Sequence, residues 1–248
     1  MSDYNTYQHY LHNGMSFTIQ KKMLGYDLNN YDKNFNKIFY ESIQIYKSLE
    51  TLDLIHSLVS NVPDRSYFDD RNIFEDNYLR YHIENFYSSS ISMLDKLAKL
   101  LNRLLKLKIK SKDCSFINLI RDKSDFLPLE IRDIVNQLNQ DTKKLRKQRN
   151  YIIHEGEFID DDWFMFSSLV FLSRKPEYPI NAIQLASEVE KEFRKYANII
   201  DIWNKSLSTS ITDIFQYLTP LIREIAEMTI NSSELEVIIH VKTELKKK

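Results

Sequence analysis

Three side chains with the chemistry to act on a phosphodiester stand close together in the second half of the chain, in the stretch R-N-Y-I-I-H-E-G at 149–156. Arg149 carries a permanent positive charge on a planar fork that matches the oxygens of a phosphate. His154 is of the residue type best suited to transfer a proton near neutral pH. Asn150 can position a ring or a substrate through its amide. The three predict charge stabilisation and proton transfer at a phosphorus atom.

A run of positive charge comes directly before this motif, at Lys143, Lys144, Arg146 and Lys147. Such a cluster predicts contacts with the backbone of a polyanion. The alternative is a solvated basic face, which the helix dipole favours near the C-terminal end of a helix.

Helical geometry limits how the motif can work. Asn150 and His154 are four residues apart, about 40° around an ideal helix, so the amide can orient the imidazole. Arg149 and His154 are about 140° apart and about 7–8 Å apart along the axis, so they do not share a face. The arginine must reach around the helix, or the last turn must be distorted, or two chains must share the site. A histidine in a last turn can also be only a cap or a surface residue.

Apolar residues spaced three and four apart predict the helices that must hold this motif. We expect long amphipathic helices at about 34–59, 73–107, 128–155 and 182–218, with a kink or a restart at Pro220 and helix onward to about 228. The segment 163–172 is apolar enough to be either helix or strand. Arg149 falls on the apolar seam of the third helix, where it needs a carboxylate or phosphate partner.

The scarcity of turn-forming residues favours an all-α fold with few connections, since the chain has three glycines and five prolines in 248 residues. Gly156 is expected to end the motif helix. We expect an N-terminal arm at 1–32 with a short strand at 17–19, a helical domain at 33–230, and a C-terminal tail at 231–248 with a strand at 235–241.

Composition excludes several classes of protein. The single cysteine, Cys114, rules out an internal disulfide and a cysteine-rich zinc site. The longest apolar cluster is too short to span a membrane, so we expect a soluble cytoplasmic protein. The motifs GxxxxGK[ST], GxSxG, HExxH and GxGxxG do not occur. His9 and His12 have a spacing that could bind a metal, but they lie in the arm, so we expect no metal or other cofactor.

The stretch R-N-Y-I-I-H resembles the R-N-x-x-x-H signature of the HEPN superfamily (higher eukaryotes and prokaryotes nucleotide-binding domains). The preceding helix, with F-Y-S-S-S-I-S-M-L-D-K-L-A-K-L-L-N at 86–102, also resembles the core helix before that motif. Within the superfamily the chain resembles the Cthe2314-like group. The resemblance implies an all-α HEPN-like bundle of long antiparallel helices, with minor extended segments at its periphery.

The resemblance also implies a function, namely metal-independent RNA cleavage by a toxin or phage-defence enzyme. Arg149 would stabilise the phosphate and the transition state, and His154 would act in acid–base transfer or as an orienter around the ribose 2′-hydroxyl. Asn150 would be a positioning residue, while Lys143, Lys144, Arg146 and Lys147 would bind RNA. Members typically form homodimers with a shared site, and an antitoxin or defence-system protein is a further expected partner. Some carry a tyrosine two residues after the histidine, which a partner nucleotidyltransferase modifies, and Gly156 stands there instead.

Two alternatives to the nuclease stay open. One is a catalytically inactive HEPN-like module that binds RNA, a nucleotide or a protein. In the other, a helical scaffold, Arg149 forms a structural ion pair with a carboxylate of its own bundle. Tyr87, Ser88 and Asp95 could also face a cleft, although the apolar stripe and the solvent face of their helix explain them.

Overall fold

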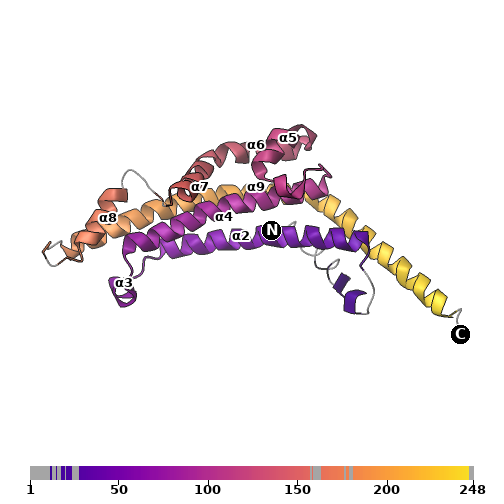
Figure 1. Cartoon of the computed structure of the whole chain (residues 1–248), viewed down its shortest axis with the longest axis horizontal. Coiled ribbons are helices and arrows are strands. Elements are labelled where there is room, and N and C mark those ends of the chain that lie inside the picture. The colour runs from indigo at the N-terminus through magenta and orange to yellow at the C-terminus, as the bar shows by residue number, and fades with distance from the viewer. Residues whose placement is uncertain are drawn as a thin grey trace. The chain divides into compact units, whose positions relative to one another are not determined.

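The computed structural model describes residues 12, 15, 18–19, 21–23, 28–156, 158, 163–175, 177–178 and 181–245. Over these residues the chain is helical and contains no strand (Figure 1), which confirms the all-α fold class. The α-helices are α2 (Asn30–Ser60), α3 (Arg65–Arg71), α4 (Glu75–Leu104), α5 (Phe116–Lys123), α6 (Leu129–Asp141), α7 (Lys143–Glu155), α8 (Trp163–Leu172) and α9 (Ala182–Leu245), with 3-10 turns η1 (Ser111–Asp113) and η2 (Ser124–Phe126).

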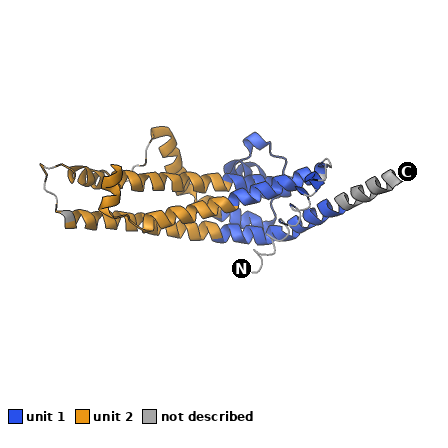
Figure 2. Ribbon diagram, turned by 90° about the horizontal axis from the view of Figure 1, so that it is seen from below, with its two compact units in different colours: residues 1–45, 95–137, 209–248 blue, residues 46–94, 138–208 orange. Residues whose placement is uncertain are grey.

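The chain divides into two compact units, coloured separately in Figure 2. Unit 1 comprises residues 1–45, 95–137 and 209–248, and unit 2 comprises 46–94 and 138–208. The whole of α7, which carries the motif, belongs to unit 2. The expected division into arm, helical domain and tail stays a prediction.

The apolar stripe predicted for α4 is the buried face of that helix. Its members from Ile83 to Leu104 are all at most 8% exposed. The stripe predicted for α2 is only partly right, since Tyr46 is 40% and Leu54 58% exposed. The buried row of α2 is mostly apolar but also includes Ser42 and Ser48, and the Ser42 hydroxyl donates to the Ile38 carbonyl at 2.8 Å. A buried serine whose hydroxyl bonds its own helix escapes a search for apolar periodicity.

Two predicted boundaries are wrong. The helix expected at 128–155 is two helices, α6 and α7, separated at Thr142. Of the two alternatives at Pro220, the restart is wrong, because α9 continues through the proline to Leu245. Leu218 and Ile222 are buried on either side of the proline, and this packing outweighs the lost backbone hydrogen bond.

Both predicted strands are also wrong at the residues that the structure describes. Residues 235–241 belong to α9, because a helix already formed adds each further residue at little cost. At 17–19, residues 18 and 19 are helical, and the Thr18 hydroxyl donates to the Met15 carbonyl at 3.0 Å. Phe17 lies outside the described residues.

The start of α2 is fixed by a capping box that also anchors the arm. The Asn29 N–H donates to Asp32 Oδ2 at 2.8 Å, and the Asp32 N–H donates to Asn29 Oδ1 at 2.9 Å. Asp32 also pairs with Lys21 at 2.9 Å, and both side chains are at most 2% exposed. These contacts explain why α2 begins at Asn30, before the first apolar residue of the sequence pattern.

His82 of α4 should make unit 2 less stable in acid. Its ring packs edge-on against Tyr78, with centroids 4.5 Å apart, and burial lowers its pKa from the ordinary 6.5. In the window below 6.5 and above the folded pKa, the unfolded chain binds more protons, so the free energy of unfolding falls as pH falls. Urea unfolding across this window should show that the free energy of unfolding falls more steeply with falling pH in the wild type than in His82→Phe, which keeps a ring.

Tyr81→Phe is the matched control for this measurement. Tyr81 also contacts His82, with ring centroids 5.3 Å apart, but its own side chain is 63% exposed. The variant should therefore keep the wild-type acid dependence. An identical pH slope in the wild type and His82→Phe would contradict the assignment to His82.

Among the helices of the described ranges, none combines the length and the apolar character needed to cross a bilayer.

Candidate functional site

The beginning of α7 is held by a network around Thr142. This threonine is fully buried, and its hydroxyl donates to the Leu138 carbonyl. Arg146 Nη1 donates to Thr142 Oγ1 at 2.7 Å, and Nη2 donates to the carbonyl and side-chain oxygens of Asn139, each at 2.7 Å. The guanidinium of Arg146 is thus already bonded to its own chain. Its expected contact with RNA stays a prediction.

Four polar side chains form one exposed stripe along α7, which we call the outer stripe: Lys143, Lys147, Asn150 and His154. Their spacings of four, three and four residues place all four within about 60° of one another around the helix. Lys144 is exposed beside them. The fold therefore brings the predicted asparagine, histidine and three of the predicted basic residues to one side of α7.

Arg149 lies on a different side of the helix. It is half-buried, near the row of Leu145 and Ile152 that packs inward. Its Nη1 donates to Asn150 Oδ1 over 3.4 Å, a long and weak hydrogen bond. Among the residues that the structure describes, no carboxylate forms an ion pair with it.

Within one chain, Arg149 and His154 are not brought together. The helix continues without interruption through both residues, so the ideal separation of about 140° applies. Neither a distorted last turn nor a hydrogen bond links them in the described part of the chain. Of the three arrangements that the sequence allows, the uninterrupted helix excludes a distorted last turn, and the other two remain: an arginine that reaches around the helix, or a site shared between two chains.

The last turn of α7 ends as the sequence predicts. Gly156 adopts a φ of 90°, in the left-handed region that favours glycine, and its N–H donates to the Ile152 carbonyl at 2.9 Å. Any side chain here would strain the backbone, although nothing within 4 Å would obstruct a Cβ atom.

An aromatic cluster anchors the chain just after this glycine. Phe158 is 2% exposed, and its N–H donates to Glu84 Oε1 of α4 at 2.8 Å. Its ring contacts three others at centroid distances of 5.5–5.8 Å: Tyr87, Trp163 and Tyr196. Sequence reasoning missed Phe158 and Glu84. The only available signal was an aromatic residue two positions after the helix-ending glycine.

The weaker candidates have structural roles. Tyr87 is buried against Phe158. Asp95 accepts a hydrogen bond of 2.9 Å from the Phe116 N–H at the start of α5. His12 packs edge-on against Phe39, and His9 lies outside the described residues. No group of three or more potential metal ligands occurs in the part of the chain that was described.

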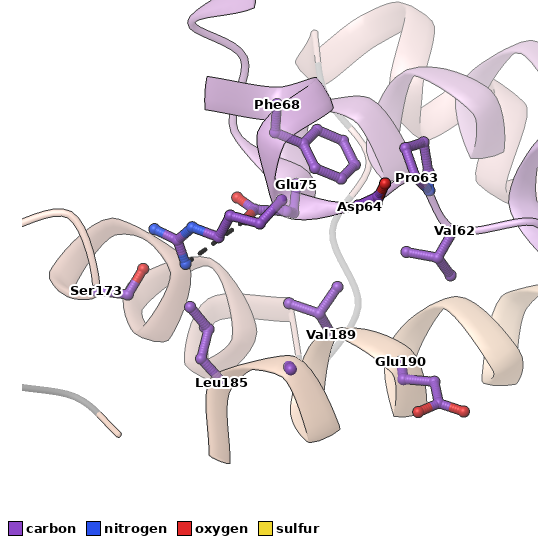
Figure 3. Close-up of a pocket in the computed structure, with 11 residues that line it drawn as sticks. Val62, Pro63, Asp64, Phe68, Glu75, Ser173, Leu185, Val189 and Glu190 are labelled. Carbon is purple, nitrogen blue, oxygen red and sulfur yellow. Dashed lines mark ion pairs between the residues drawn. The ribbon is translucent and has the colours of Figure 1, made fainter. Parts of the chain in front are cut away.

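A cavity of about 600 Å³ lies elsewhere in unit 2. Figure 3 shows Val62, Pro63 and Phe68 on one side and Leu185 and Val189 on the other. Sequence analysis did not predict this cavity, and no residue of the motif lines it.

The buried carboxylate at this cavity already has partners. Glu75 is 3% exposed and pairs with Arg65 at 3.8 Å and with Arg174 at 3.2 Å. The negative charge of Glu75 is therefore compensated within the fold.

A family model for Cthe2314-like HEPN domains matches residues 43–234, a range that includes Arg149, Asn150 and His154. Neither a curated protein nor a solved structure matches the chain. A match to HEPN domains points to an RNase-type or nucleotide-binding function. Because the matched range covers most of the chain, the protein belongs to the Cthe2314-like HEPN family.

Proposed function

We propose that this HEPN protein is a metal-independent endoribonuclease, acting in the cytoplasm as a toxin or phage-defence enzyme. The observation that carries the proposal is the outer stripe, which presents Lys143, Lys147, Asn150 and His154 to solvent on one helix face. Arg149, on a different side of α7, has no described carboxylate partner, so its charge is available to a phosphate.

The reaction needs only proton transfer and charge stabilisation. The ribose 2′-hydroxyl loses its proton, and its oxygen attacks the adjacent phosphorus. The bond from phosphorus to the 5′-oxygen breaks, and that oxygen gains a proton. The products are a 2′,3′-cyclic phosphate and a 5′-hydroxyl. Arg149 stabilises the charge on the phosphoryl oxygens, His154 transfers a proton, and Asn150 orients the imidazole.

A homodimer with a composite site is part of the proposal, because Arg149 and His154 of one chain lie on different sides of α7. Tyr151 and Ile153 flank His154 and are 41% and 51% exposed, so the last turn offers apolar surface to a second copy. Two outer stripes brought face to face repel each other unless an anion lies between them. An RNA backbone supplies that anion, and an antitoxin or defence-system protein is a further proposed partner.

Cleavage in the absence of metal tests the proposal directly. Purified protein is incubated with a mixture of tRNA, rRNA and mRNA in EDTA, and the new ends are analysed. We expect fragments with 2′,3′-cyclic phosphate and 5′-hydroxyl ends. Cleavage that requires added Mg²⁺, or that leaves 5′-phosphates, would contradict the mechanism.

The second candidate function is a binding module without catalysis. The observation that favours it is the separation of Arg149 from His154 within one chain. In that case the protein binds RNA or a nucleotide through the basic residues of α7 but leaves every RNA intact. The same assay, combined with a binding measurement, separates the two functions.

A further inference from the structure

A second basic surface lies in unit 1, where the chain leaves α4. We call it the lysine strip: Lys106, Lys108, Lys110 and Lys112. All four side chains are exposed. Of the residues between them, Leu107 is 6% exposed and Ile109 is half-buried, whereas Ser111 is exposed at the start of η1. The alternation exposes Lys106, Lys108 and Lys110 in turn, and Lys112 adds a fourth exposed charge in η1.

This segment is held in place by Asn102 of α4. The Asn102 side chain accepts a hydrogen bond of 3.0 Å from the Ile109 N–H and donates one of 2.9 Å to the Ile109 carbonyl. The Asn102 carbonyl also accepts from the Leu107 N–H at 3.1 Å. The lysine strip is thus displayed on a fixed backbone.

The backbone of the strip is strained at two of its lysines. Lys106 and Lys108 have φ values of 52° and 63°. Only Asn72 shares this left-handed conformation among the non-glycine residues that the structure describes, and asparagine tolerates it better than lysine does. Strained conformations are retained where the surrounding structure enforces them and often mark functional sites. Glycine or asparagine would suit these positions if only the turn mattered.

The charge of the strip is not neutralised by its surroundings. No described carboxylate forms an ion pair with any of its four lysines. Nearby carboxylates have other partners: Glu41 pairs with Arg103, Asp95 accepts from the Phe116 N–H, and Asp122 pairs with Arg121. Asp113 directly follows the strip and is the one acidic neighbour for which no side-chain partner is described. Lys99 adds an exposed positive charge on α4.

We propose that the lysine strip binds the phosphate backbone of RNA, as a second contact surface separate in sequence from α7. The identification of the bound polyanion as RNA rests on the proposed function. Lysines bind phosphates as point charges, and the strip contains no aromatic side chain to stack on bases, so binding is independent of base sequence. The net charge of the whole chain is −1, so an anionic chain is attracted only by local surfaces of this kind.

The test compares two triple variants that remove the same charge. The strip variant is K106N/K108N/K110Q, with asparagine where φ is positive so that the turn is kept. The control variant is K191Q/R194Q/K205Q, whose three cations are exposed on α9 in surface ion pairs. Affinity for a fluorescent single-stranded RNA is measured from 50 to 200 mM salt in a His154→Ala background, so that cleavage does not interfere.

The strip variant should bind RNA on the order of 10- to 100-fold more weakly at 0.1 M salt, with a log–log salt slope about 2 units smaller. The affinity of the control variant for RNA should stay within about threefold of the parent at every salt concentration. The reason is that salt screens exposed charges that lie far from the bound RNA. Equal slopes and affinities for the two triple variants, with unchanged unfolding midpoints, would overturn the proposal. The proposal would also be overturned if the strip variant lost binding to phosphatidylserine–phosphatidylcholine vesicles but kept its affinity for RNA.

The outcomes for the strip and for catalysis are separable. If the wild type does not cleave RNA but the strip variant loses affinity and salt slope, the nuclease proposal fails and the strip stands. If the wild type cleaves RNA and the strip variant binds like the control, the strip proposal fails and the nuclease stands.

Discussion

Replacing His154 by alanine should lower the rate constant for RNA cleavage by about 10²–10⁴-fold, the range for loss of a general acid–base group. The side chain is exposed at the end of α7, so the fold should be unaffected. Affinity for RNA should stay near that of the wild type, because the positive charges of the outer stripe remain. Single-turnover cleavage and unfolding midpoints, measured on the same preparations, check both parts of this expectation.

Arg149→Ala should lower the rate constant by about 10²–10³-fold, since it removes one preorganised donor to the phosphoryl oxygens. Arg149→Lys keeps the charge but loses the planar fork, and it should recover only part of the rate. Lys205→Gln, a surface change on α9, serves as the control and should cleave at the wild-type rate. A full rate for either alanine variant would contradict the assigned role.

Mixing the two inactive variants tests whether two chains share the site. If Arg149 of one chain acts with His154 of the other, a mixed dimer of Arg149→Ala and His154→Ala has one complete site. Random mixing should then restore activity on the order of a quarter of the wild type, since half of the dimers are mixed. A site made within one chain predicts no recovery at any ratio.

Phe158→Ala should lower the free energy of unfolding by about 3–5 kcal/mol, the range for removing a fully buried phenylalanine. The ring packs among Tyr87, Trp163 and Tyr196, and its loss leaves a cavity beside the end of α7. Because this cluster anchors the chain two residues after Gly156, cleavage should fall as well. Urea unfolding at neutral pH measures the first effect, and cleavage at low temperature measures the second.

Phe164→Ala is the matched control for Phe158→Ala. Phe164 lies in α8 and is 76% exposed, so the same change in side chain should cost less than about 0.5 kcal/mol. Similar losses for the two variants would show that the cluster around Phe158 is not a rigid part of the core.

Several features followed from the sequence because they depend on neighbouring residues alone. The buried face of α4 follows from apolar spacing, and the bounds of α8 at Trp163 and Leu172 agree with the apolar segment found in the sequence. Gly156 ends α7 because glycine adopts a positive φ without strain. The motif from Arg149 to His154 and the family resemblance are likewise local patterns, and the match over 43–234 confirms the family.

Other features could not be found in this way because distant contacts outweigh the local pattern. The seven-residue repeat from Ile131 to Ile152 continues across Thr142, so it predicts one helix, although Thr142 and Arg149 replace apolar residues in the second row. Only the packed structure shows Thr142 buried, with Arg146 bonded to it. The ion pair of Asp32 with Lys21 was equally hidden, since it joins the start of α2 to a residue of the arm.

The two arginines of α7 illustrate the division most clearly. By sequence, Arg146 and Arg149 are the same residue type, three positions apart in one basic run. The sequence determined that this run is helical and precedes a histidine. Only the tertiary structure decided that the guanidinium of Arg146 is held by Asn139 and Thr142, while Arg149 has only a weak contact with Asn150 among the described residues. The reason is that hydrogen-bond partners are set by where the helix breaks and turns, and the local sequence pattern does not record that position.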